Sequence, residues 1–85
     1  MAYSVALAPA ADRQFRKLPA LVRQRLKPHI DSLASTPRPA GTVKMHGEPN
    51  LYRIRVGSYR IVYYVFDRDR EVLVVKIRDR REVYR

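Results

Sequence analysis

Hydrophobic and charged positions alternate along residues 52–56, and a run rich in β-branched and aromatic residues follows at 59–66, with only Gly57 and Ser58 between the two. A period of two predicts β-strands, because successive side chains of a strand point to opposite faces of a sheet. Gly at the first position of a two-residue loop favours a type II′ turn, whose twist suits the flanking strands. We therefore predict a β-hairpin at the centre of the fold.

The tight turn also fixes which residues of the hairpin share a face. Arg55 is expected opposite Arg60 and Arg53 opposite Val62, so that three arginines gather on one side. The other side is expected to carry Tyr52, Ile54, Ile61 and Tyr63. Like charges directly opposite each other repel by about 0.2–1 kcal/mol, and a bound anion would relieve that repulsion. A solvated outer face is the ordinary alternative for such a cluster.

Two helices are predicted before the hairpin. Alternation at residues 3–7 predicts a short first strand, and the hydrophobic spacing of residues 11–18 predicts a helix after it. A second helix is expected from Pro19 to Ser35, because proline suits a first helical turn. Pro28 inside it predicts a kink or two shorter helices, since proline lacks the N–H that a helix interior uses. The two helices should form an antiparallel hairpin packed on the sheet.

The remaining segments are a connection and a last strand. Prolines and glycines along residues 36–50 predict an irregular connection. The valine-rich segment Glu71–Ile77 predicts a fourth strand that pairs with the hairpin. Regular pairing would place Val62 opposite Val75 and would put Arg78 on the helix side, unless a bulge re-aims it.

Composition narrows the class of protein. A chain of 85 residues is the size of one small domain, and 46% hydrophobic residues favour a folded protein. Eighteen Lys and Arg against eight Asp and Glu give a net charge of +10, which suits a polyanion such as nucleic acid. Without cysteine, we expect no disulfide and no thiolate metal site, and no motif indicates a cofactor. No signal peptide or membrane span is indicated, so the cytoplasm is the expected location.

Three segments carry a resemblance to a known family, namely Lys44–Gly47, Leu51–Tyr63 and Arg80–Arg85. With the strand and helical hairpin before them, they make the chain resemble the RelE/ParE superfamily of toxins from type II toxin–antitoxin systems, and its RelE branch more closely. The resemblance implies an α+β fold in which a small antiparallel sheet, with an N-terminal strand, carries the helical hairpin on one face. It also implies a single toxin domain over residues 1–85.

The same resemblance implies an activity and a set of site residues. RelE-like members cut messenger RNA in the ribosomal A site, so a ribosome-dependent mRNA endonuclease that inhibits translation is expected. Such an enzyme turns the ribose 2′-OH onto the neighbouring phosphate. Carried over by motif, the catalytic positions are Arg53, Arg55, Arg60, Arg78 and Tyr84. RNA-binding positions are expected at Lys44, Arg80 and Arg81.

The chain departs from the family in two respects that bear on proton transfer, and one is that Arg78-Asp79 stands where many relatives have Gly-His, so a histidine acid is absent there. The family often has lysine in the first strand of the central hairpin, where this chain has Arg53 and Arg55. Arginine is a poor general base because its pKa exceeds about 12. Proton transfer is therefore expected from Tyr84, Glu82 or Lys44, or else the catalysis is largely electrostatic.

The partners follow partly from the resemblance and partly from charge. The resemblance implies a separately encoded antitoxin, and a basic chain with hydrophobic residues on its basic face favours an acidic, amphipathic segment of that antitoxin. The ribosome and mRNA are the other expected partners, and no membrane is expected. The main alternative is a ParE-like inhibitor of DNA gyrase without nuclease activity. A basic RNA-binding module without catalysis is a third interpretation.

Overall fold

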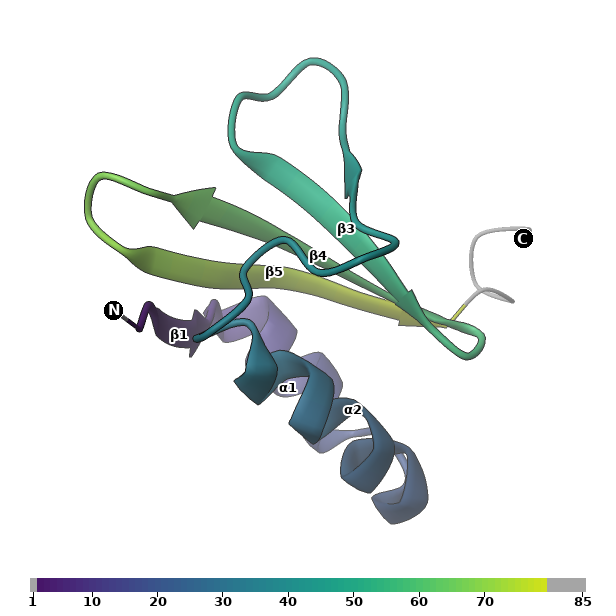
Figure 1. The fold of residues 1–85 in the computed structure, drawn as a ribbon. Coiled ribbons are helices and arrows are strands. Elements are labelled where there is room, and N and C mark those ends of the chain that lie inside the picture. The colour runs from purple at the N-terminus through teal and green to yellow at the C-terminus, as the bar shows by residue number, and fades with distance from the viewer. Residues whose placement is uncertain (1, 80–85) are drawn as a thin grey trace.

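The structure is a computed structural model that describes residues 2–79, and it contains one five-stranded sheet with two helices on one side (Figure 1). The sheet has the order β1-β5-β4-β3-β2. In chain order the elements are β1 (Ser4–Leu7), α1 (Pro9–Arg16), α2 (Ala20–Ser32), β2 (Val43–Lys44), β3 (Leu51–Val56), β4 (Tyr59–Phe66) and β5 (Glu71–Asp79).

The predicted α+β class and the strand-helix-helix-strand order are confirmed, with two differences in the sheet. The first strand, β1, pairs with β5 in parallel, so the sheet is mixed and not wholly antiparallel. The second difference is β2, a two-residue strand inside the segment expected to be irregular, which pairs with Tyr52 and Arg53 of β3. Among residues 2–79 no helix is long and apolar enough to cross a membrane.

Local sequence explains where the helices begin and end. Pro9 occupies the first turn of α1, and Asp12 lies near its N-terminus, where the helix dipole favours negative charge. The second helix begins after Pro19 and runs unbroken through Pro28, so the expected division into two shorter helices does not occur. Residue 28 and Gln24, whose carbonyl loses its helical partner, are both exposed, so water can hydrogen-bond that carbonyl.

The hydrophobic core lies between the helices and one face of the sheet. The buried side chains on the sheet side include Ile61, Tyr63, Val65, Val72 and Val74, and those on the helix side are Ala11, Leu26, Ile30 and Leu33. Burying this face stabilises the domain, because apolar area removed from water contributes about 25 cal/mol per Å². The opposite face, which we call the open face, is not covered by either helix (Figure 1).

The central hairpin has the predicted register. Arg55 pairs with Arg60, and Arg53 pairs with Val62. Gly57 has a φ of 60°, as the first position of a type II′ turn requires, and Ser58 has no positive φ. The expected gathering of three arginines on one face is therefore confirmed.

The pairing of β4 with β5 contains a β-bulge that corrects one prediction. Tyr63 pairs with Val74, but Val62 pairs with Lys76, so Val75 is an extra residue in β5. The predicted pairing of Val62 with Val75 is therefore wrong. Because one extra residue reverses the faces of everything beyond it, Arg78 pairs with Arg60 on the open face and not on the helix side.

A side chain from α1 covers the edge of β5 beyond the bulge. Strand β1 ends at Leu7, opposite Val74, so within residues 2–79 the last part of β5 has no neighbouring strand on that edge. There the side-chain Oε1 of Gln14 accepts a hydrogen bond from the backbone N–H of Ile77 at 2.9 Å. The helix thus replaces a strand at the position where the register has shifted.

Candidate functional site

Two rows of side chains cross the open face from β3 to β5. The first row is Arg55, Arg60 and Arg78, one arginine from each strand. The second row is Arg53, Val62 and Lys76. Directly opposite residues of paired strands share a face and lie close together. We call these the arginine rows, and they bring five cationic side chains onto one small area.

Sequence reasoning found four of the five cations and missed Lys76. The signal was present, because Lys76 and Arg78 are two positions apart and must share a face of a strand. Only the bulge, however, puts that pair on the same face as Arg60. Arg55, Lys76 and Arg78 are exposed, whereas Arg53 and Arg60 are half-buried.

The rows carry positive charge that no described ion pair neutralises. The ion pairs found in residues 2–79 are Arg16–Asp12, Lys27–Asp31 and Arg38–Asp67, and none of them includes a cation of the rows. Partial burial lowers the pKa of Arg53, and the like charges of Arg55 and Arg60 lower it further. The positive charges of these guanidinium groups therefore repel one another. A bound anion would reduce that repulsion.

Two hollows adjoin the rows. A hollow of about 400 Å³ lies beside β3, with its walls formed by Ala40, Gly41, Val43, Arg53, Ile54 and Arg55. A smaller one of about 50 Å³ lies at the hairpin turn and is lined by Arg55, Gly57, Ser58, Tyr59 and Arg60. Arginine atoms line both, and the planar guanidinium suits phosphate oxygens.

One wall of the larger hollow is a loop that a polar cluster fixes in place. The guanidinium of Arg38 donates to Asp67 Oδ1 at 2.9 Å and lies over the ring of Tyr52, 5.5 Å from its centroid. The hydroxyl of Tyr63 donates to the backbone oxygen of Pro37 at 2.9 Å. Hydrogen bonds from Arg38 and from Tyr3 hold the pKa of Asp67 below its usual value. Sequence reasoning missed this cluster, because its members are far apart in the chain.

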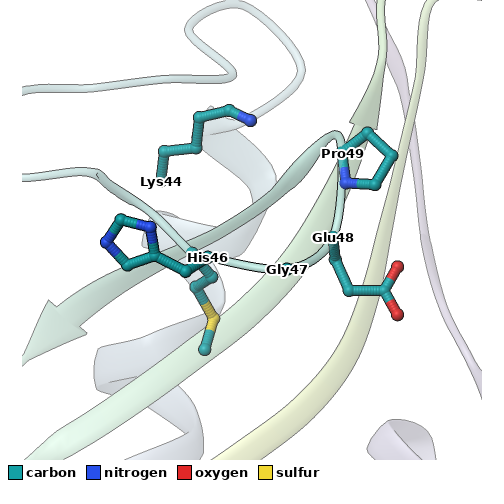
Figure 2. Close-up of a pocket in the computed structure, with 6 residues that line it drawn as sticks. Lys44, His46, Gly47, Glu48 and Pro49 are labelled. Carbon is teal, nitrogen blue, oxygen red and sulfur yellow. The ribbon is translucent and has the colours of Figure 1, made fainter.

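Lys44, the remaining predicted site residue that the structure describes, is not brought to the rows. Lys44 pairs with Tyr52, so by register it belongs to the helix side of the sheet. It lines a separate hollow of about 400 Å³ formed by residues 44–49. There His46 and Glu48 point away from each other on opposite sides of the loop (Figure 2). The predicted positions Arg80, Arg81 and Tyr84 lie outside the described residues. Across residues 2–79, no group of three or more His, Asp or Glu could hold a metal ion.

The chain is similar in sequence to known toxins. Residues 5–84 match the family model of the ParE toxin of the type II toxin–antitoxin system parDE. The chain is 36% identical over 88 aligned positions to the mRNA interferase toxin RelE of Escherichia coli K12, covering 99% of this chain and 92% of that protein.

Comparison with solved structures agrees. The RelE–RelB complex of Pyrococcus horikoshii matches with a TM-score of 0.83 at 28% identity, covering 94% of this chain and 97% of the other. A free E. coli RelE variant, with two arginines changed to alanine, matches with a TM-score of 0.79 at 34% identity, covering 99% and 92%. The intact E. coli RelBE toxin–antitoxin complex matches with a TM-score of 0.78 at 32% identity, covering 91% and 95%.

Proposed function

The chain belongs to the ParE toxin family of type II toxin–antitoxin systems, and from this premise we propose that it is a RelE-like toxin that cuts messenger RNA on the ribosome. The observation that carries the proposal is the first arginine row, in which Arg60 lies between Arg55 and Arg78 on the open face. A relative with 36% identity is named an mRNA interferase, and this row supplies the chemistry that such an activity needs.

Arg60 is the phosphate clamp of this proposal. Flanked on both sides by a further arginine, it can approach the two non-bridging oxygens of the scissile phosphate, with Arg78 beside it. The attack of a ribose 2′-OH on phosphorus adds negative charge to those oxygens. Preorganised donors aimed at developing oxyanion charge are worth about 3–4 kcal/mol each. The row therefore accelerates cleavage mainly by electrostatic stabilisation.

The reaction breaks one phosphorus–oxygen bond and forms another. The 2′-OH loses its proton as its oxygen bonds to phosphorus, and the 5′-oxygen of the next nucleotide leaves and gains a proton. The products are a 2′,3′-cyclic phosphate and a free 5′-hydroxyl. Arg53 and Arg55 hold the phosphate backbone but do not serve as bases. We assign proton transfer or base stacking to Tyr84, and further contacts to the RNA backbone to Arg80 and Arg81.

An antitoxin is the proposed partner that silences the toxin. The structural relatives from P. horikoshii and E. coli include complexes of RelE with RelB. A chain with a net charge of +10 and an uncovered sheet face suits an acidic, amphipathic segment that folds as it binds. The proposed site of action is the ribosome, which places the toxin in the cytoplasm.

The test is a translation reaction with ribosomes and a defined messenger, in which new 5′ ends are mapped by primer extension. We expect cuts in register with codons that disappear when ribosomes are omitted. Arg60→Ala should lower the cleavage rate about 100–1000-fold, whereas Arg68→Ala, which removes the same charge from the β4–β5 turn, should not. If folded parent protein makes no cuts, the proposal is wrong, and a gyrase supercoiling assay tests the alternative.

A further inference from the structure

The open face carries a pair of stacked aromatic rings beyond the arginine rows. The rings of Tyr64 and Phe66 are 5.6 Å apart between centroids and only 9° from parallel. Both belong to β4 and follow Val62 and Arg60 at intervals of two, so they lie on the same face as the rows. Each ring is half-buried and thus keeps some surface accessible to a ligand.

The surroundings of the pair are apolar and hollowed. Tyr64 has Leu51 and Leu73 as its cross-strand neighbours, and neither helix covers this face (Figure 1). A hollow of about 180 Å³ adjoins Phe66, lined also by Ser4, Ala6, Glu71, Val72 and Leu73. The open face is therefore cationic at one end of β4 and aromatic at the other.

We propose that the Tyr64–Phe66 pair is a base-stacking subsite for the single-stranded RNA whose phosphates lie on the arginine rows. This inference rests on the proposed function and extends it, because it gives the substrate a path across the sheet. Tyr64 lies four positions after Arg60 in β4, which is about 13 Å along an antiparallel strand. A few nucleotides of extended RNA span that distance.

The combination of features favours RNA over a purely hydrophobic ligand. Single-stranded nucleic acid is bound by a positive groove that follows the backbone and by aromatic side chains on which bases stack. Here the cations and the rings share one continuous face, and the cations form no ion pair with a described acid. Glu71 lies opposite Phe66 and repels phosphate, so the base, and not the backbone, reaches the pair.

The experiment measures binding of the full chain to a 2′-O-methylated RNA of about eight nucleotides, which lacks the attacking hydroxyl. The variant Tyr64→Leu/Phe66→Leu keeps apolar cover but removes both rings, and Tyr64→Phe keeps both. We expect the double variant to bind about 10-fold more weakly, which is about 1.4 kcal/mol, and Tyr64→Phe to bind like the parent. The dependence of affinity on salt should not change, since no cation is removed.

A scan of the RNA with single abasic nucleotides tests the same contact without altering the protein. One abasic position should weaken binding to the parent about 10-fold and have no further effect on the double variant. Equal affinity of the parent and the double variant for RNA, or an abasic scan without a sensitive position, overturns the proposal. The proposal is also overturned if the double variant binds RNA like the parent but loses affinity for an acidic, amphipathic peptide. That result assigns this face to a protein partner.

The result of the RNA-binding experiment can be distinguished from the result of the cleavage experiment that tests the proposed function. The oligonucleotide assay uses no ribosome and no cleavage, so a parent protein that makes no cuts refutes the function and leaves the stacking measurement unaffected. Conversely, a parent that cuts messenger RNA and shows no base-stacking position refutes the subsite alone. Thermal unfolding of the double variant, followed by circular dichroism, establishes that it is folded before its affinity is compared.

Discussion

Replacing Arg60 by glutamine should stabilise the free protein, although it removes the residue on which the proposed activity depends. Arg60 is the only member of the first arginine row with an arginine on each side, Arg55 on β3 and Arg78 on β5. Both neighbours repel it, and no described carboxylate offsets that repulsion through an ion pair. Glutamine keeps part of the aliphatic stem and removes the charge.

The expected gain can be worked out from Coulomb's law. Two unit charges about 7 Å apart in a medium with a dielectric constant of about 80 repel by about 0.6 kcal/mol. Screening reduces this to about 0.5 kcal/mol per pair at 0.01 M salt and to about 0.06 kcal/mol at 1 M. With two neighbours, Arg60→Gln should raise the free energy of unfolding by about 0.9 kcal/mol at low salt. For a domain of this size that corresponds to about 5 °C in melting temperature.

The assay is thermal unfolding, followed by circular dichroism, at 0.01 M and 1 M sodium chloride. Arg60→Lys keeps the charge and should show no gain that depends on salt. Arg68→Gln lowers the net charge equally, but from the β4–β5 turn, where Asp67 and Asp69 are its neighbours in sequence. The reasoning is refuted if Arg60→Gln melts no higher than the parent at low salt, or if Arg68→Gln gains as much.

Two further predictions concern the residues that hold the site in place. Gln14→Leu leaves the N–H of Ile77 without its acceptor, so the protein should lose about 1 kcal/mol of stability and the Ile77 amide should exchange hydrogen faster, whereas Gln14→Glu should behave like the parent. Asp67 has a pKa below its usual 3.8 because of hydrogen bonds from Arg38 and then Tyr3. Its contribution to stability is present above that value and lost as the pH falls through the folded-state pKa, so Asp67→Asn should melt below the parent at pH 7, and the difference should shrink as the pH is lowered below 3.8.

The hairpin could be predicted from sequence because its information is local. A two-residue loop with Gly57 at its first position permits one register, and that register placed Arg53, Arg55 and Arg60 on one face. The helices were predictable for the same reason, since their hydrophobic spacing and flanking prolines are read within a few residues. The division of the second helix at Pro28 was wrongly allowed for, because the cost of that proline depends on whether water can reach the exposed carbonyl of Gln24.

The parts that failed depend on contacts between distant segments. The hydrophobic run of residues 72–75 does not show which residue of β5 is the extra one, and the contact that accompanies the bulge comes from Gln14 on a helix more than sixty residues earlier. Lys76 therefore went unnoticed as a member of the arginine rows. The direction of β1 was missed because alternation of side chains is the same in parallel and antiparallel strands. The place of Lys44 could not be predicted, because only the folded chain determines how its segment pairs with β3, and its proposed contact with RNA stays a prediction.

The parallel pairing of β1 with β5 has a consequence for how the protein is made. Residues 4–7 find their partners at residues 71–74, so β1 cannot join the sheet until β5 has been synthesised. Pairings of such long sequence separation form slowly, because the chain loses the entropy of closing a long loop before the contacts between the strands contribute to stability. Arg78 completes the first row only when β5 has left the ribosome. A nascent chain that has not yet released β5 therefore lacks an assembled arginine face.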